Sequence, residues 1–332
     1  MIVKWGVIGC GDIAQRMGIP AILQAPRSEL VAVADTNAAR AAEVGARFGA
    51  NHVCSSVEEL LRDEEVNAVY IAVPPTAHRD LTVQCALAGK HVLCEKPMAV
   101  TAAECADMIH TCSARRVLLA IAYYRRFYPK VLKIRELLQA GRIGQVVFAR
   151  IQFTMWYNPV DPAAGKEWRT QKAAGGGGCL VDLGSHRLDI LAALLGDACR
   201  VSASLGTTAC NYAVEDCAYV LAEFPGGVRA FASFNWNTRA QTDELELYGT
   251  EGRIIASPLD QASLHVHTPA GIQSWELPRN ELTHLPVVEN VVRNLNGEES
   301  LRVPGEEAIK ASRVIDAAYR SAREGCAVTL FP

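Results

Sequence analysis

Short apolar runs alternate with segments of helical periodicity along the first 122 residues. Five of these runs have the length and composition of buried strands, and they span residues 3–8, 30–34, 68–73, 91–94 and 117–122. The segments between them place apolar residues at helical spacing, with helices expected to begin near residues 12, 38, 56, 76 and 101. Strands that alternate with helices in this way predict an α/β fold with a doubly wound parallel sheet.

The pattern changes after residue 122, where strand-like runs dominate. Pro225-Gly226-Gly227 separates two such runs and is typical of a hairpin turn. The expected strands lie at 146–153, 216–224, 228–234, 244–248, 253–256, 263–267, 272–277 and 327–330, and the expected helices at 129–139, 183–195, 286–296 and 306–323. We predict two domains, residues 1–122 and residues 123–332. The second is expected to be an α+β domain with an open, mostly antiparallel sheet that buries one face.

A glycine motif follows the first strand directly. Gly9-Cys10-Gly11-Asp12-Ile13-Ala14 fits the pattern G-x-G-x-x-G/A. Gly9 permits a tight turn, Gly11 lets a pyrophosphate approach the backbone, and Ala14 lets the next helix pack against the strand. The motif alone is weak, but the strand before it and the helix after it favour a dinucleotide site. Its predicted cofactor contacts are Gly9, Gly11, Asp12 and Ile13.

An acid closes the second strand. Asp35 lies where a carboxylate that binds the adenosine ribose is expected, and it would repel a 2′-phosphate. No arginine follows at once, and Arg40 comes about a turn later. NAD is therefore the predicted cofactor, with NADP as the alternative. A purely structural interpretation of Asp35 is that it caps the helix beginning near Ala38.

Two further strand ends carry candidate residues. The carboxyl ends of parallel strands share one edge, where ligands bind. Pro74, Thr76 and His78 follow the third of the five strands, and Glu95-Lys96-Pro97 follows the fourth. We expect these residues to contact the cofactor. Lys96 could instead be a solvated loop lysine, and His78 a surface residue in the first turn of a helix.

Four consecutive glycines, residues 175–178, precede a second candidate group. Asp182 and His186 are four residues apart in a predicted helix, so they should project from the same face. The pair combines a carboxylate with an imidazole that titrates near neutral pH. An acid–base role and a plain surface pair both fit this spacing. Four flexible glycines cost ordering entropy, so we expect either a packing reason for them or a functional one, such as close approach of a substrate.

The composition and charge of the chain give no support to two kinds of partner, nucleic acids and membranes. The chain has 332 residues, 21% of them charged, and a formal charge of −3, which gives no bias toward nucleic acid or membranes. The eleven cysteines are scattered and form no C-x-x-C pair, which is typical of reduced thiols in the cytoplasm. The N-terminus enters a strand at once, so we expect no signal peptide. His265 and His267 lack a third ligand, so no metal site is expected.

The ordered set of motifs resembles the glucose-fructose oxidoreductase, inositol dehydrogenase and rhizopine catabolism family (Gfo/Idh/MocA). The set consists of Gly9-x-Gly11-x-x-Ala14, Glu95-Lys96-Pro97, Tyr124-Arg125-Arg126-Phe127, Trp168-Arg169, Gly177-Gly178-x-x-x-Asp182-x-x-x-His186 and Gly249-Thr250-Glu251-Gly252. The resemblance implies a Rossmann cofactor-binding domain, followed by a substrate-binding domain whose sheet forms homodimer or homotetramer contacts. It also implies a cis bond before Pro97.

The resemblance also implies roles for individual residues. Lys96, Asp182 and His186 would be catalytic, and Trp168-Arg169 would reach the cofactor. Tyr124 and Arg125 would contact the substrate, although many members have Asn where this chain has Tyr124. The implied activity is NAD(P)-dependent interconversion of a secondary alcohol and a ketone on a sugar, sugar derivative or cyclitol. The alternatives are a non-catalytic NAD(P)-binding regulator, or a dehydrogenase acting at an anomeric carbon or on a dihydrodiol.

Overall fold

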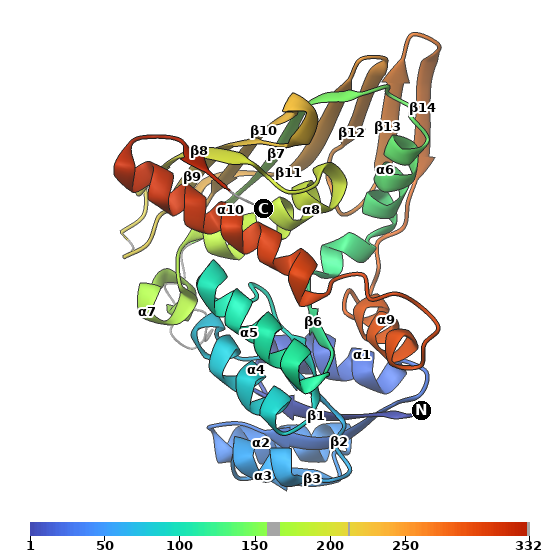
Figure 1. The fold of residues 1–332 in the computed structure, drawn as a ribbon, viewed down its shortest axis with the longest axis vertical. Coiled ribbons are helices and arrows are strands. Elements are labelled where there is room, and N and C mark those ends of the chain that lie inside the picture. Colours follow the sequence, from blue (N-terminus) through green and yellow to red (C-terminus); the bar gives the residue numbers. More distant parts are fainter. Residues whose placement is uncertain (158–166, 212, 331–332) are drawn as a thin grey trace. The chain divides into compact units, whose positions relative to one another are not determined.

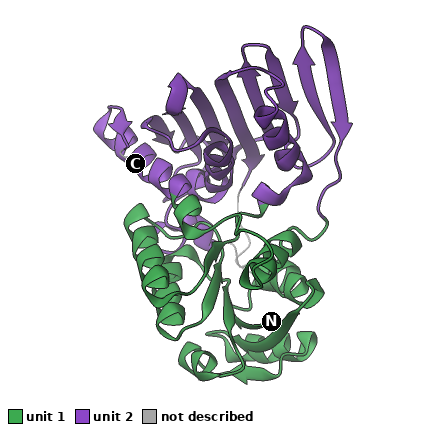
Figure 2. Cartoon of the chain, turned by 45° about the vertical axis from the view of Figure 1, so that its right-hand side comes forward, with its two compact units in different colours: residues 1–124, 281–309 green, residues 125–280, 310–332 purple. Residues whose placement is uncertain are grey.

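The computed structural model describes residues 1–157, 167–211 and 213–330. The chain forms two compact units, one of residues 1–124 and 281–309 and the other of residues 125–280 and 310–332 (Figures 1 and 2). The predicted domains placed residues 281–309 in the second domain, whereas this segment packs within unit 1. The main-chain contact between Ile121 and Val303 holds it there, at 3.1 Å from N to O. The functional roles of the two domains stay predictions.

A six-stranded parallel sheet forms the centre of unit 1, as predicted. Its strands are β1 (Val3–Ile8), β2 (Ser28–Ala34), β3 (His52–Cys54), β4 (Ala68–Ile71), β5 (His91–Cys94) and β6 (Leu119–Ile121). Their order is β3-β2-β1-β4-β5-β6, and every neighbouring pair is parallel. This is the strand order of dinucleotide-binding sheets. β3 was not predicted from the sequence.

The helices of unit 1 connect these strands and cover the sheet. They are α1 (Ile19–Gln24), α2 (Ala38–Phe48), α3 (Val57–Arg62), α4 (His78–Leu87), α5 (Ala102–Arg115) and α9 (Leu285–Leu295). Thr101 and Glu104 form the complete capping box expected from the sequence at the start of α5. A π turn at Ala14–Gly18 precedes α1. The helical path from the glycine motif is therefore continuous, but it is widened in its first turns.

Unit 2 contains a nine-stranded sheet that is mostly antiparallel, also as predicted. Its strands are β7 (Val146–Trp156), β8 (Arg200–Gly206), β9 (Cys217–Glu223), β10 (Arg229–Asn235), β11 (Asn237–Gly249), β12 (Gly252–Ala256), β13 (Ser263–Thr268), β14 (Gly271–Glu276) and β15 (Val328–Thr329). Their order is β14-β13-β12-β11-β7-β10-β9-β8-β15, and only β7 and β10 pair in parallel. The predicted hairpin joins β9 and β10.

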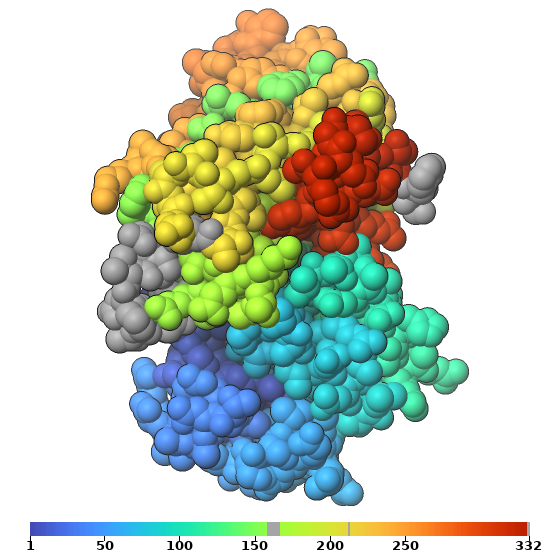
Figure 3. Space-filling view, turned by 90° about the vertical axis from the view of Figure 1, so that its left-hand side faces the viewer, coloured from blue at the N-terminus to red at the C-terminus, as the bar shows by residue number. Residues whose placement is uncertain are grey.

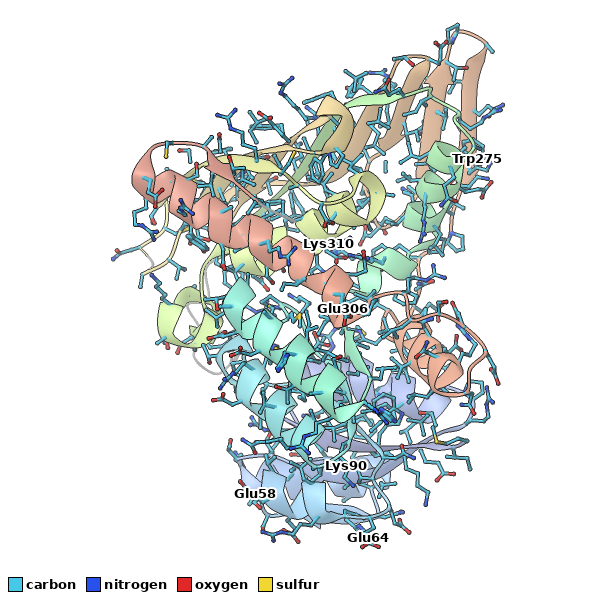
Figure 4. The ribbon with its side chains drawn as sticks, viewed as in Figure 1. Glu58, Glu64, Lys90, Trp275, Glu306 and Lys310 are labelled. Carbon is cyan, nitrogen blue, oxygen red and sulfur yellow. The ribbon has the colours of Figure 1, made fainter. Side chains whose placement is uncertain are left out.

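Among the described residues, three helices lie within unit 2, and a fourth belongs to both units. They are α6 (Pro129–Gln139), α7 (Lys172–Gly175), α8 (Ser185–Leu195) and α10 (Gly305–Glu324), whose residues 310–324 fall in unit 2. The ammonium of Lys133 on α6 lies 5.1 Å from the ring centre of Trp275 on β14 (Figure 4). None of the helices described is long and apolar enough to cross a membrane.

The glycine segment before α8 is explained by packing within unit 2. A methyl group added at Gly177 would overlap the Tyr319 hydroxyl, and one at Gly178 would overlap the main-chain oxygen of Glu215. The Glu215 carboxylate accepts hydrogen bonds from the Gly178 N–H at 3.0 Å, the Leu180 N–H at 3.1 Å and the Tyr319 hydroxyl at 2.8 Å. Of the two predicted reasons for the glycine segment, packing accounts for Gly177 and Gly178. Protein atoms fill the space beside both of them.

Replacing Gly178 should destabilise the fold because the carbonyl of Glu215 cannot yield to a new methyl group. We expect Gly178→Ala to lower the free energy of unfolding by about 1–3 kcal/mol. Urea unfolding followed by circular dichroism measures the difference. Gly206→Ala is the matched control, since a methyl group there makes an ordinary contact of 3.6 Å with the Cys217 sulfur. Equal losses in the two variants would contradict this account.

Candidate cofactor and substrate sites

The glycine motif turns the chain at the carboxyl end of β1. Gly9 has φ 93°, and its N–H donates to the Ala34 carbonyl at 2.9 Å. A methyl group added at Gly9 would overlap the main-chain carbonyl of Ala72, which follows the neighbouring strand β4. Gly11 differs, because a methyl group added there would meet nothing within 4 Å. The turn is therefore fixed by protein contacts at Gly9, whereas the space beside Gly11 is open.

Asp35 adjoins this turn at the end of β2. Its carboxylate accepts hydrogen bonds from the main-chain N–H groups of Cys10 at 2.7 Å and Asn37 at 2.8 Å. The helix cap at α2 is Asn37, whose side chain accepts from the Arg40 N–H at 3.1 Å. The capping interpretation of Asp35 is therefore wrong. A ribose-binding role remains open to this carboxylate.

Arg40 also binds Asp35, which the sequence analysis did not foresee. Its Nε and Nη2 atoms lie 3.1 Å and 2.7 Å from the two carboxylate oxygens. Burial alone would raise the pKa of Asp35, but the hydrogen bonds from Arg40, Asn37 and Cys10 lower it below its usual range. Asp35 is therefore ionised at neutral pH, with a guanidinium against it.

Pro74 and Thr76 are exposed after β4, whereas His78 is fully buried. The ring nitrogens of His78 lie 2.9 Å from the Val73 carbonyl oxygen and 2.8 Å from that of Pro97. Burial lowers the pKa of His78 despite these carbonyls, which favours the neutral ring. A cofactor contact through the His78 side chain, and the alternative of a surface residue, are both wrong. The imidazole instead lies between the loops that follow β4 and β5, and in its neutral form it donates to one of the two carbonyls.

The Glu95 side chain is also held inside unit 1. Its carboxylate accepts hydrogen bonds from the Tyr70 hydroxyl and His284 Nε2, both at 2.7 Å, and from the Lys96 N–H at 3.2 Å. Only 5% of Glu95 is exposed, and its carboxylate is engaged with Tyr70 and His284, so its cofactor contact stays a prediction. Burial would raise the pKa of Glu95, but His284 and Tyr70 lower it. Glu95 therefore anchors the loop that presents the half-exposed Lys96 and the cis bond before Pro97.

His284 is a residue that sequence reasoning missed. It lies 189 positions from Glu95, on the segment that returns to unit 1, and no motif marks it. Its Nδ1 atom is 3.2 Å from the Thr283 hydroxyl, and its ring centre is 5.1 Å from that of Tyr124. Tyr124, a predicted substrate contact, is half-buried and ends the first segment of unit 1. Glu95, His284 and Tyr124 thus form one contact chain.

In unit 2, Asp182 lies just before helix α8, and His186 is the second residue of that helix. Leu180–Gly184 is a π turn, and α8 begins at Ser185. The same-face alignment expected of an α-helix is therefore altered, because a π turn contains more residues per turn. His186 is 5% exposed, and Asp182 has a side chain exposed to 16%. π turns occur often at functional sites, and this one holds the predicted catalytic residue Asp182, with His186 following it in α8.

Arg169 is brought to Asp182 by the fold. Its Nη1 atom lies 3.6 Å from the Asp182 carboxylate, and its guanidinium lies 5.4 Å from the ring centre of Trp168. Both residues belong to the short 3₁₀ turn Glu167–Thr170. The predicted cofactor residue Arg169 therefore lies beside the predicted catalytic residue Asp182 within unit 2, and Trp168 packs against Arg169.

Buried ion pairs hold two residues that follow His186 in α8, Arg187 and Asp189. Arg187 is 1% exposed and binds Asp243 through Nε at 3.0 Å and Nη2 at 2.8 Å. Arg126 binds Asp189 in a bidentate pair at 2.8 Å and 2.7 Å. Arg125, a predicted substrate contact, lies 3.3 Å from Asp243 and has a side chain exposed to only 12%. Removing one partner of such a pair leaves an uncompensated charge, so the sequence around His186 is tightly constrained.

The two histidines that were considered as metal ligands each contact a neighbouring polar side chain. His265 lies 2.8 Å from the Ser274 hydroxyl, and His267 lies 3.4 Å from an Arg253 nitrogen. Within the described ranges, no group of three or more His, Cys, Asp or Glu residues is arranged to hold a metal ion. All eleven cysteines are free thiols.

Comparison with protein families gives matches over most of the chain. A model described as an oxidoreductase family with an NAD-binding Rossmann fold matches residues 3–123. A model described as the GFO/IDH/MocA C-terminal domain matches residues 131–255.

Similar proteins cover nearly the whole chain. A 1,5-anhydro-D-fructose reductase from Ensifer adhaerens is 30% identical over 97% of this chain and 88% of its own length. A D-xylose 1-dehydrogenase (NADP(+)) from Haloferax volcanii is 30% identical over 99% of this chain and its full length.

One solved structure extends the comparison to the fold. The aldose-aldose oxidoreductase from Caulobacter crescentus has a TM-score of 0.88 and 28% identity, and the match covers 99% of this chain and all of that one. The strand order of unit 1, the sheet of unit 2 and both family models agree. The chain belongs to the Gfo/Idh/MocA family of oxidoreductases.

Proposed function

We propose that the chain is an NAD(P)-dependent oxidoreductase that interconverts a secondary alcohol and a ketone on a sugar, sugar derivative or cyclitol. The observation that carries the proposal is the open space at Gly11 beside the Asp35 carboxylate, at the carboxyl edge of a sheet with the dinucleotide-binding strand order. Relatives named as sugar reductases and sugar dehydrogenases support the substrate class.

Unit 1 supplies the cofactor residues in this proposal. The main chain from Gly9 to Ile13 would hold the pyrophosphate, since Gly11 leaves room for it and helical N–H groups follow. Asp35 would bind the adenosine ribose, and the exposed Pro74 and Thr76 would line the next strand end. Bound nicotinamide supplies the position that accepts or donates the hydride.

Side chains of the protein would transfer the proton and donate a hydrogen bond to the reacting oxygen. In oxidation, His186 would take the hydroxyl proton, and in reduction it would return one to the oxygen. Lys96 would donate a hydrogen bond to that oxygen and stabilise the negative charge that develops on it. Asp182, with Arg169 at 3.6 Å, would bind a neighbouring substrate hydroxyl and orient His186. Tyr124 and Arg125 are proposed to contact the substrate.

A non-catalytic regulator is the rival from a different class. Such a protein would keep the nucleotide site but would not need the catalytic lysine or histidine, and this chain retains Lys96, Asp182 and His186. Turnover assays with inositols, aldoses, nucleotide sugars and a trans-dihydrodiol, each with NAD and NADP, distinguish the classes. Product analysis separates a ketone from a lactone, which tests oxidation at an anomeric carbon. Nucleotide binding without turnover of any substrate would favour the regulator.

We also propose that the sheet of unit 2 forms a homodimer or homotetramer contact. Four neighbouring side chains define an open-face cluster, each exposed to between 37% and 42%: Phe148, Tyr219, Leu221 and Phe231. Leu221 pairs directly with Phe231 in the register of β9 and β10. Residues 200–211 and 213–235 contribute the yellow surface of unit 2 (Figure 3). Monomeric proteins rarely expose large contiguous apolar patches, so a second copy of this sheet is the proposed occupant.

The free thiols support the cytoplasm as the proposed location. Nine of the eleven cysteines are buried or half-buried, and none forms a disulfide. Thiols persist in this form in reducing compartments.

Gly11→Ala tests the proposed pyrophosphate cradle. The added methyl group meets nothing in the protein, so the melting temperature should stay close to that of the wild type, whereas NADH affinity should fall at least about tenfold through its clash with the pyrophosphate. Fluorescence titration with NADH measures the affinity. Gly206→Ala is the control and should bind NADH normally. Unchanged affinity in Gly11→Ala would place the cofactor elsewhere.

Lys96→Ala tests the proposed role of the ammonium at the reacting oxygen. The kcat should fall by about 10²–10³, as when one donor to a developing oxyanion is removed. The NADH dissociation constant should change far less, since the lysine acts on the substrate. Lys90→Met is the control, because the Lys90 ammonium binds the Asp63 and Val66 carbonyls at 2.8 Å and 2.6 Å (Figure 4). That variant should lose stability but not turnover. Equal losses of turnover and cofactor binding in Lys96→Ala would contradict the role.

Phe231→Lys tests the proposed oligomer contact. A charge in the open-face cluster should convert the assembly to monomers, measured by size-exclusion chromatography with light scattering. Leu87→Lys is the control, since Leu87 is 53% exposed in unit 1 and lies outside the cluster. A monomeric wild-type protein, or an equal effect in both variants, would refute this contact.

A further inference from the structure

The Asp35 carboxylate is already saturated with hydrogen bonds from the protein. Oδ1 accepts from the Asn37 N–H at 2.8 Å and from Arg40 Nη2 at 2.7 Å. Oδ2 accepts from the Cys10 N–H at 2.7 Å and from Arg40 Nε at 3.1 Å. A carboxylate offers about four lone-pair sites, and these four donors occupy them. The two adenosine ribose hydroxyls can therefore bind Asp35 only if two donors leave.

Only the two donors from Arg40 can leave without unfolding the turn. The Cys10 N–H belongs to the glycine turn, and the Asn37 N–H precedes α2, so both are fixed by the main chain. The Arg40 side chain is 43% exposed, whereas that of Asp35 is 3% exposed. Arg40 thus covers the carboxylate on its solvent side. The ribose of NAD must compete with this guanidinium for the same oxygens.

The pairing of Arg40 with Asp35 hinders the ribose of NAD, but it would favour the 2′-phosphate of NADP. A bare Asp35 would repel that group, which carries a charge of roughly −1.5 to −2 near neutral pH. The guanidinium neutralises the carboxylate and can pair with phosphate oxygens in a bidentate manner. Arg40 therefore supplies the positive charge that Asp35 lacks for binding the 2′-phosphate of NADP. Its side chain lies next to the expected position of the ribose.

We propose that Arg40 sets the cofactor preference of this chain by competing with the ribose of NAD and by binding the 2′-phosphate of NADP. This inference rests on the proposed function, because it assumes the nucleotide site at Gly11 and Asp35. It replaces the sequence-based expectation that the acid alone selects NAD. The chain accepts both nucleotides, and the balance between them depends on one side chain.

Fluorescence titrations with NADH and with NADPH test the proposal on the full-length protein. Arg40→Ala should tighten NADH binding about three- to tenfold, because the competitor is gone, and should weaken NADPH binding at least tenfold. Arg40→Lys should retain part of the NADPH affinity, because it keeps the charge but not the bidentate geometry. Arg47→Ala is the matched control on the same helix. Arg47 contacts Gln15 and Phe48, so its loss should leave the ratio of affinities unchanged.

Three outcomes overturn the inference. The ratio of NADH to NADPH affinity could stay constant in Arg40→Ala, both affinities could fall together, or Arg47→Ala could shift the ratio as strongly. In each of these cases the nucleotides still bind, so the proposed oxidoreductase function survives. Failure of the wild-type protein to bind either nucleotide would instead refute the nucleotide site itself and the role of Arg40 with it.

Discussion

The carboxyl ends of all strands in a parallel sheet lie at the same edge. The proposed nucleotide site depends on this constraint. β1, β2, β4 and β5 are hydrogen-bonded neighbours that run in the same direction. Each is followed by a segment with candidate chemistry: the glycine turn, Asp35, the Pro74–His78 loop and Lys96. Residues that are up to ninety positions apart in the chain thus share one edge.

Buried polar contacts then make this edge rigid. His78 is buried between the Val73 and Pro97 carbonyls and donates to one of them, so its ring packs the loops after β4 and β5 together. Glu95 binds Tyr70 and His284, and thereby fixes the residue just before Lys96. Tyr70 can pack where it does because Gly18 has no side chain, and a methyl group there would overlap its ring. His78 and Glu95 therefore support the two loops that carry the predicted ligand contacts Thr76 and Lys96.

The sequence predicted those features that depend on local pattern. The strand and helix alternation, the turn at Gly9, the acid after β2 and the capping box at Thr101 all follow from residue types at short spacing. The sequence did not reveal contacts between distant residues, such as Glu95 with His284 or Gly178 with Glu215. It also misjudged Arg40, because distance along the chain does not show that a long side chain folds back onto Asp35. Burial of His78 was missed for the same reason, since its neighbours in sequence are exposed or half-buried.

The central claim is that a nicotinamide nucleotide binds along the carboxyl edge of the six-stranded sheet. Hydrogen–deuterium exchange with mass spectrometry, with and without NADH, tests this most directly. We predict added protection in peptides that cover residues 9–14 and 35–40, with little change in β12–β14. Protection confined to unit 2, or none at NADH concentrations that saturate binding, would contradict the claim.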